Sequence, residues 1–257
     1  MKAIEKIVEI PIYWDDLKSL SLDEKALLAL ASYAASESNT ISKLYLFSTH
    51  KMTGDEIVDS AISIQIMVLL RYWSAKLFEF FESISEISNS RGTKDDNVIR
   101  LAKESFDAFS ILEELRGYEI ARAIRHEATN HYSFKAAKKN IGHVSDRANC
   151  KLYLHNKDGN SWYPFGEEVM FSGRLNRAGA SLRTKEEKTQ LLKDWLDWNL
   201  SATRWANKAY ELIATELVLD RLPDRNARQK LLWLEPELVG EIEGRKTPVF
   251  LRNGVGR

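Results

Sequence analysis

The residues of this chain best suited to chemistry form one short polar segment, RHEATNH, at positions 125–131. The guanidinium of Arg125 can stabilise charge that develops on a phosphate through two parallel hydrogen bonds. The imidazole of His131, with an unperturbed pKa of about 6.5, can move protons near neutral pH. RNA supplies its own nucleophile in the 2′-hydroxyl. The pair therefore suggests phosphodiester cleavage of RNA without a metal or other cofactor, with Arg125 and His131 as the catalytic residues.

A helix would bring these two side chains together. If residues 118–139 form one helix, Arg125 and His131 lie about 60° to either side of Ala128, whose small side chain leaves a notch between them. Glu127 lies one turn before His131, where a carboxylate can orient the imidazole. The supporting candidates are Glu127, Arg122 and His126.

A zinc site is the second interpretation of this segment, because His126-Glu127 and His131 resemble the metalloprotease pattern H-E-x-x-H with one extra residue. Histidines five positions apart lie about 140° apart around a helix and cannot share a metal without a break. Glu127 and His131 could share one, but a di-iron bundle needs Glu-x-x-His on two helices, and that spacing does not occur. We therefore expect no metal.

A purely structural role is the third interpretation. The charged side chains Arg122, Arg125 and Glu127 would then form a solvated helix face with weak local ion pairs. His131 would be a core histidine hydrogen-bonded to the backbone. The two roles differ in what mutation does, because a structural histidine contributes to stability and a catalytic one to rate.

Residues 125–131 resemble the R-x(4–6)-H motif of the HEPN superfamily (higher eukaryotes and prokaryotes nucleotide-binding domains), with His126 at the usual polar position after the arginine. The resemblance covers about residues 20–145 by architecture. It implies a helical bundle with two long antiparallel helices and the motif on a later helix. It also implies a metal-independent endoribonuclease of toxin–antitoxin, abortive-infection or other defence systems.

In members of that superfamily the active site is a cleft between two protomers, each giving one arginine and one histidine. Carried over, Arg125 stabilises the phosphate, and His131 serves as base or acid. The implied partners are RNA, a second copy of the chain and a cognate antitoxin. Some members lack nuclease activity, so the alternative function is a non-catalytic helical module that binds protein or nucleotide.

The charge distribution offers an independent test of an RNA partner. The whole chain has 37 basic and 37 acidic residues, a net charge of zero, which gives no sign of nucleic-acid binding. Residues 116–151, however, hold eight basic and three acidic residues, a net charge of +5. Cations gathered around a motif are what a phosphate-binding groove requires. The candidate substrate-binding residues are Arg116, Tyr132 and Lys135.

Hydrophobic periodicity and capping signals predict a mainly α-helical bundle of five to six antiparallel helices, organised as one domain over residues 1–257. Three capping boxes of the form S/T-x-x-E begin at Ser21, Thr53 and Thr184. The expected helices are 22–48, 54–87, 96–115, 118–139 and 185–219, with a shorter one near 225–233.

The last long helix carries an apolar stripe from Leu191 to Leu212 at alternating spacings of four and three, including three tryptophans. Such a stripe can be a dimer seam, but we favour a bundle core. Residues 150–172 break the helical pattern and are rich in aromatic residues. Asp158-Gly159 predicts a β-hairpin insertion there, with the strand that contains Pro164 at an edge.

The sequence also bears on localisation. The first residues carry charges and lack the apolar core of a signal peptide, and the most apolar run, Ala61–Leu70, is too short to span a bilayer. The single cysteine, Cys150, excludes an intramolecular disulfide. We therefore expect a cytoplasmic protein.

Overall fold

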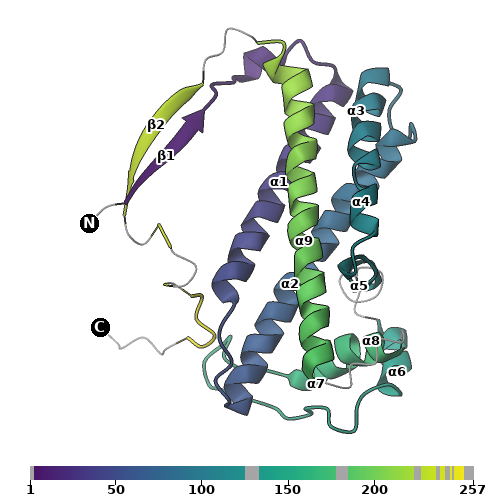
Figure 1. The fold of residues 1–257 in the computed structure, drawn as a ribbon, viewed down its shortest axis with the longest axis vertical. Helices are drawn as coiled ribbons and strands as arrows, with labels where there is room; N and C mark the ends of the chain where they lie inside the picture. Colours follow the sequence, from purple (N-terminus) through teal and green to yellow (C-terminus); the bar gives the residue numbers. More distant parts are fainter. Residues whose placement is uncertain are drawn as a thin grey trace. The chain divides into compact units, whose positions relative to one another are not determined.

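The computed structural model describes residues 3–124, 133–177, 185–222, 227–235, 238–240, 244 and 246–251. As predicted, the fold is mainly α-helical (Figure 1). Among the described residues it also contains a two-stranded antiparallel β-ribbon, formed by strands at positions other than the predicted hairpin. In chain order the elements are β1 (Ala3–Glu9), η1 (Trp14–Leu17), α1 (Leu22–Ser48), α2 (Glu56–Ser88), α3 (Asp96–Asp107), α4 (Ser110–Glu113), α5 (Gly117–Ile124), α6 (Phe134–Ile141), α7 (Pro164–Glu167), η3 (Glu168–Gly173), α8 (Arg174–Arg177), α9 (Lys185–Ala214), η4 (Thr215–Leu219) and β2 (Arg228–Leu234).

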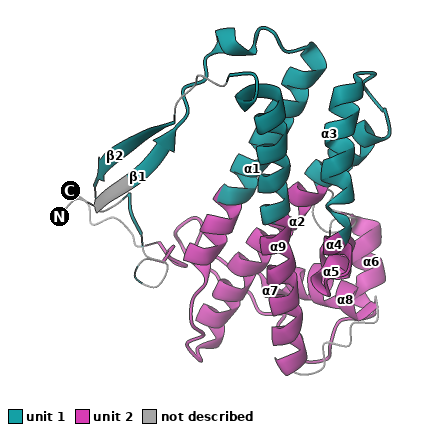
Figure 2. Cartoon of the chain, turned by 45° about the horizontal axis from the view of Figure 1, so that its top comes forward, with its two compact units in different colours: residues 1–39, 79–110, 203–245 teal, residues 40–78, 111–202, 246–257 magenta. Residues whose placement is uncertain are grey.

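The chain divides into two compact units, each made of three separate stretches of sequence (Figure 2). Unit 1 contains residues 1–39, 79–110 and 203–245. Unit 2 contains residues 40–78, 111–202 and 246–257. The long helices α1, α2 and α9 each contribute to both units, and the candidate site belongs to unit 2.

The capping predictions can be compared with the hydrogen bonds at the helix starts. The box at Ser21 is confirmed, because the Ser21 N–H donates to Glu24 Oε2 at 2.8 Å and the Glu24 N–H donates to Ser21 Oγ at 3.1 Å. The box at Thr53 is wrong. Asp55 caps α2 instead, accepting the N–H groups of Ile57 and Val58 at 2.9 and 3.0 Å. The box at Thr184 lies outside the described residues.

The tryptophan stripe of α9 is confirmed as core. In unit 2, Trp195 and Trp198 are fully buried. The indole N–H of Trp195 donates to Ser74 Oγ at 2.7 Å, and that of Trp198 donates to the Leu112 carbonyl at 3.2 Å. In unit 1, Trp205 donates in the same way to the Ser105 carbonyl at 2.8 Å. Side chains already buried and hydrogen-bonded within the single chain are not free to form a dimer seam.

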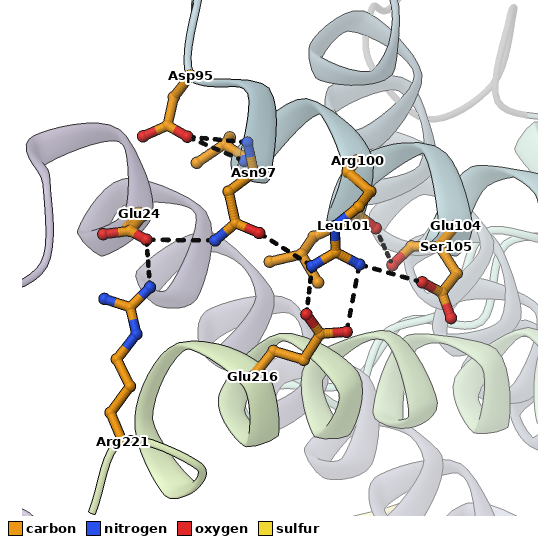
Figure 3. Close-up of polar contacts among 10 residues, drawn as sticks. Glu24, Asp95, Asn97, Arg100, Leu101, Glu104, Ser105, Glu216 and Arg221 are labelled. Carbon is orange, nitrogen blue, oxygen red and sulfur yellow. Dashed lines mark hydrogen bonds and ion pairs between the residues drawn. The ribbon is translucent and has the colours of Figure 1, made fainter.

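In unit 1, a network of hydrogen bonds and ion pairs connects the start of α1 with the start of α3 and with residues in and just after η4 (Figure 3). Glu24 accepts hydrogen bonds from Arg221 at 2.6 Å and from Asn97 at 3.3 Å. Arg100 pairs with Glu216 nearby. The hydrogen bond from Arg221 is the main reason why the pKa of Glu24 lies below its ordinary value of 4.5. Ionised Glu24 therefore stabilises the folded state.

Acid is expected to remove this contribution. Because the folded-state pKa is lowered, the stabilisation is complete above pH 4.5 and is lost as the pH falls through the folded-state pKa. Glu24→Gln should lower the free energy of unfolding at pH 7 by about 1 kcal/mol, a modest figure because the Arg221 side chain is 38% exposed. Urea unfolding at pH 7 and pH 3 measures both effects. Equal losses for the variant at both pH values would contradict the role of the ionised carboxylate.

The segment near 225–233, predicted as a short helix, contains a strand instead. Strand β2 pairs antiparallel with β1, with Lys6 opposite Leu231 and Glu9 opposite Arg228. Lys230 also pairs with Glu9 across the ribbon. The prediction failed because the partner strand lies more than 200 residues earlier in the chain, and long-range pairing overrides local helix propensity.

The hairpin predicted over residues 150–172 is present only in reduced form. A single bridge joins Tyr153 to Trp162, with both backbone N–H groups bonded to the opposite carbonyl at 3.1 and 2.8 Å. The turn between them uses Gly159 at φ +84°, as the Asp-Gly signal predicts. From Pro164 onward the predicted strand is helical, because proline suits the first turn of a helix and begins α7.

Helix α2 is long and apolar enough, by length and composition, to cross a membrane, with a mean hydropathy of 1.2 over a stretch of 18 residues. Within the folded chain 44% of that stretch is buried. Trp73 and Leu77 of α2 are fully buried, and Arg71 forms a two-bond pair with Glu167. These contacts are those of a core helix.

Candidate functional site

In the chain, the motif lies between α5 and α6 of unit 2. Residues 125–132, which include Arg125, His126, Glu127, His131 and Tyr132, lie outside the described residues. Helix α5 ends at Ile124 immediately before them, and α6 begins at Phe134 immediately after. The predictions for these five residues therefore remain predictions, and the described structure bears on the elements that flank them.

Ser133 begins a new helix inside the segment 118–139, which the sequence predicts as one continuous helix. Its backbone is extended (φ −105°, ψ 110°), and its side chain accepts the Ala136 N–H at 3.1 Å, which makes it the N-cap of α6. The predicted helix 118–139 is therefore interrupted at Ser133. A serine hydroxyl competes well for backbone N–H groups that a continuing helix would satisfy. The predicted positions of Arg125 and His131, about 60° to either side of Ala128, require a helical backbone from Ile124 through His131.

Helix α5 is fixed at its start by close packing against α9. A Cβ added to Gly117 would lie 2.1 Å from the carbonyl oxygen of Asp194 and 2.7 Å from Cβ of Trp198. Only glycine permits this approach of the two backbones. Ala121, one turn later, is fully buried. The helix that leads into the motif therefore has a defined position within unit 2.

The opposite face of α5 is charged and exposed. Arg122 lies with its guanidinium 6.0 Å from the ring centre of Tyr118 and 3.6 Å from the Glu119 carboxylate. Burial and the neighbouring Glu113 carboxylate raise the pKa of Tyr118, whose hydroxyl donates to Glu113 Oε1 at 3.2 Å. Arg122, a supporting candidate, thus carries only a weak exposed ion pair, which leaves its charge available to an anion.

Helix α6 is anchored by its other face. Ala136 and Asn140 are buried. Gly173 of η3 approaches so closely that an added Cβ would lie 2.8 Å from the Asn140 carbonyl oxygen. The Asn176 amide donates to the His143 carbonyl at 3.1 Å, which ties the end of α6 to α8. Figures 1 and 2 both show α5, α6 and α8 beside one another, and Figure 2 shows that all three belong to unit 2.

The outer face of α6 combines cations with an aromatic ring. Lys135, Lys138 and Lys139 are exposed. Phe134 is 77% exposed, and the Lys138 ammonium lies 4.7 Å from its ring centre. An aromatic side chain this accessible, directly after the motif, offers a face on which an unpaired base can stack.

The basic residues on both sides of the motif share one property. The seven of segment 116–151 that the structure describes are all exposed: Arg116, Arg122, Lys135, Lys138, Lys139, Arg147 and Lys151. Within the described part of the chain, two of these seven form ion pairs, Arg122 with Glu119 and Lys151 with Glu56. The positive charge read from the sequence is therefore surface charge, mostly unneutralised by the described neighbours.

Among the described residues, no group of three His, Cys, Asp or Glu side chains is placed to hold a metal ion, and His126, Glu127 and His131 lie outside them. Unit 2 also contains a pocket of about 260 Å³ that the sequence did not predict, lined by apolar residues such as Met67, Phe171 and Leu191 and by charged ones such as Glu168 and Lys188. No local sequence signal marks it, because it depends on how η3 packs between α2 and α9.

No protein-family model matches this chain, and neither a curated protein nor a solved structure matches it. The features of this chain that bear on function are therefore its own residues, namely the motif at 125–131 and the exposed cations on either side of it in the chain.

Proposed function

We propose that this chain is a metal-independent endoribonuclease of HEPN type that cleaves single-stranded RNA, acting as a toxin or defence effector in the cytoplasm. The observation that supports it is the exposed basic surface on α5 and α6, the two helices that flank residues 125–132. The motif lies between these two basic helices in the chain, so a polyanion is expected to bind on both sides of it. The active form is a homodimer in which each protomer contributes Arg125 and His131.

The proposed reaction needs only groups that the chain and RNA provide. His131 of one protomer removes the proton from the 2′-hydroxyl, whose oxygen attacks the adjacent phosphorus. The bond from phosphorus to the 5′-oxygen breaks, and that oxygen takes a proton from the protonated His131 of the other protomer. Arg125 stabilises the charge on the non-bridging phosphate oxygens. The products are a 2′,3′-cyclic phosphate and a 5′-hydroxyl.

Substrate binding is assigned to the flanking residues. Arg116 and Lys135 contact phosphates, one before the motif and one after it. Tyr132 and the exposed Phe134 stack on unpaired bases, which favours single-stranded over duplex RNA. Glu127, Arg122 and His126 support the catalytic pair by orienting it and by adding hydrogen-bond donors.

The test is incubation of the purified full chain with a labelled single-stranded RNA in the presence of EDTA. Cleavage is expected, whereas DNA of the same sequence stays intact because it lacks the 2′-hydroxyl. RNA that is bound but remains uncut would favour the alternative, a non-catalytic binding module. Cleavage that requires added Zn²⁺ or Mg²⁺ would contradict a metal-independent mechanism.

Reversing the flanking charges is expected to weaken RNA binding. Arg116→Glu and Lys135→Glu should each lower the affinity several-fold and reduce the dependence of log K on log salt by roughly 0.7 to 1. Lys208→Glu on α9, an exposed lysine of unit 1, is the matched control and should change neither. Fluorescence anisotropy at three salt concentrations measures both quantities. Equal effects of all three substitutions would place the RNA elsewhere.

A further inference from the structure

Residues 246–251, called the tail below, are held by α1 and by the turn that contains Asn160, all within unit 2. At its start, the Thr247 N–H donates to the Phe47 carbonyl at 2.8 Å, and the Thr247 carbonyl lies 2.7 Å from His50 Nε2. The Lys246 ammonium donates to the Leu46 carbonyl at 3.3 Å. Leu46 and Phe47 belong to the last turn of α1, whose carbonyls have no partner inside the helix. The segment therefore caps α1.

The other end of the segment is held by one buried side chain. Asn160 is 3% exposed, and its amide donates to the Leu251 carbonyl at 2.8 Å while its oxygen accepts the Leu251 N–H at 2.7 Å. Next to it, the rings of Phe250 and Trp162 meet edge to face with centres 6.4 Å apart. Asn160 and Trp162 belong to the turn that closes on Tyr153.

These contacts are of the kind that proteins use to bind a peptide through its main chain. Both backbone groups of Thr247 and both of Leu251 are engaged, which holds the main chain at two positions without reading its sequence. The aromatic contact of Phe250 adds selectivity for one side chain. Pro248 favours an extended conformation at Thr247, so the segment loses little conformational entropy when it docks.

We propose that unit 2 carries a binding site for a short peptide segment and that residues 246–251 are its intramolecular ligand. The site consists of the last carbonyls of α1, His50, Asn160 and Trp162. It fits a short segment in which an aromatic residue is followed by an aliphatic one, as in Lys-Thr-Pro-Val-Phe-Leu. A partner carrying such a segment takes the site when the tail leaves it. The proposal uses none of the residues assigned to RNA cleavage and is independent of that activity.

A tethered ligand competes at an effective concentration of the order of millimolar, so a peptide in solution binds poorly while the tail is in place. The experiment therefore uses the full chain with a released tail, Thr247→Pro combined with Phe250→Ala, which removes one backbone donor and the aromatic contact. A fluorescent peptide of sequence KTPVFL, residues 246–251, is titrated into this variant and into the unchanged chain.

The peptide is expected to bind the released-tail variant at least tenfold more tightly than the unchanged chain. Adding Asn160→Ala should cost at least tenfold in affinity, whereas Asn156→Ala, an exposed asparagine of the same turn, should cost nothing. Failure of the peptide to bind a folded released-tail variant, or equal binding with and without Asn160, would overturn the proposal.

Hydrogen exchange in the unchanged chain tests the same site without relying on the released-tail variant. The Thr247 and Leu251 amides should exchange slowly because both are hydrogen-bonded. Asn160→Ala should speed the exchange of Leu251 at least tenfold. Fast exchange of both amides in the unchanged chain would show that the segment does not occupy the site and would overturn the proposal.

Discussion

Replacing His131 by alanine is expected to lower the rate of RNA cleavage by about 10²- to 10⁴-fold, the usual contribution of a general acid or base. Replacing Arg125 by alanine should cost about 10²- to 10³-fold, because the phosphate charge loses its main stabilising donor. The measurement is single-turnover cleavage of labelled RNA together with the thermal unfolding temperature. The mechanism predicts slow but stable variants.

His143 provides the matched control for this prediction. It is an exposed histidine just after α6, and it is the backbone carbonyl that accepts the Asn176 amide. His143→Ala should therefore leave cleavage unchanged. If His131→Ala and Arg125→Ala clearly lower the unfolding temperature, and the lost activity matches the lost fraction of folded protein, both residues are structural. The binding-module alternative is then favoured.

Replacing Gly117 by alanine is expected to destabilise the chain by about 3 kcal/mol, as overpacking against rigid neighbours does. The added Cβ would lie 2.1 Å from the Asp194 carbonyl oxygen, a backbone atom of α9 that no side-chain rotation can move away. Because α5 leads directly into the motif, displacing it from α9 should also lower RNA cleavage. Urea unfolding and the cleavage rate measure the two effects.

Gly142→Ala is the matched control for Gly117→Ala. Gly142 ends α6 in a right-handed conformation with nothing within 4 Å of an added Cβ, so alanine should change stability by less than about 0.5 kcal/mol. Equal stability of the two variants would show that α5 does not depend on its contact with α9.

The helical part of the fold could be predicted because its signals are local. The helix expected at 22–48 is α1 with the same bounds, and the tryptophans of α9 are buried at the predicted spacing. Ser90 and Gly92 adopt positive φ between α2 and α3, where the sequence predicts the break. Capping and periodicity depend on residues a few positions apart, which one sequence displays directly.

The remaining features depend on contacts between distant parts of the chain. Strand β2 exists because β1 pairs with it, and the tail is held by Asn160 about 90 residues earlier. Ser133 could have been read as an N-cap, but the apolar pattern continues across it and favoured one long helix. Of the candidate site, the sequence predicted the exposed cations, while the pocket beside η3 and the peptide site had no local signal.

The central claim is that the 2′-hydroxyl of RNA is the nucleophile and that no metal takes part. The most direct measurement compares a single-stranded RNA with the same RNA carrying one 2′-deoxy nucleotide at its main cleavage position, both in EDTA, with the product ends identified by mass spectrometry. The account predicts a 2′,3′-cyclic phosphate and a 5′-hydroxyl from the first RNA and no cut at that position in the second. Cleavage of both RNAs, or products ending in a 3′-hydroxyl, would contradict it.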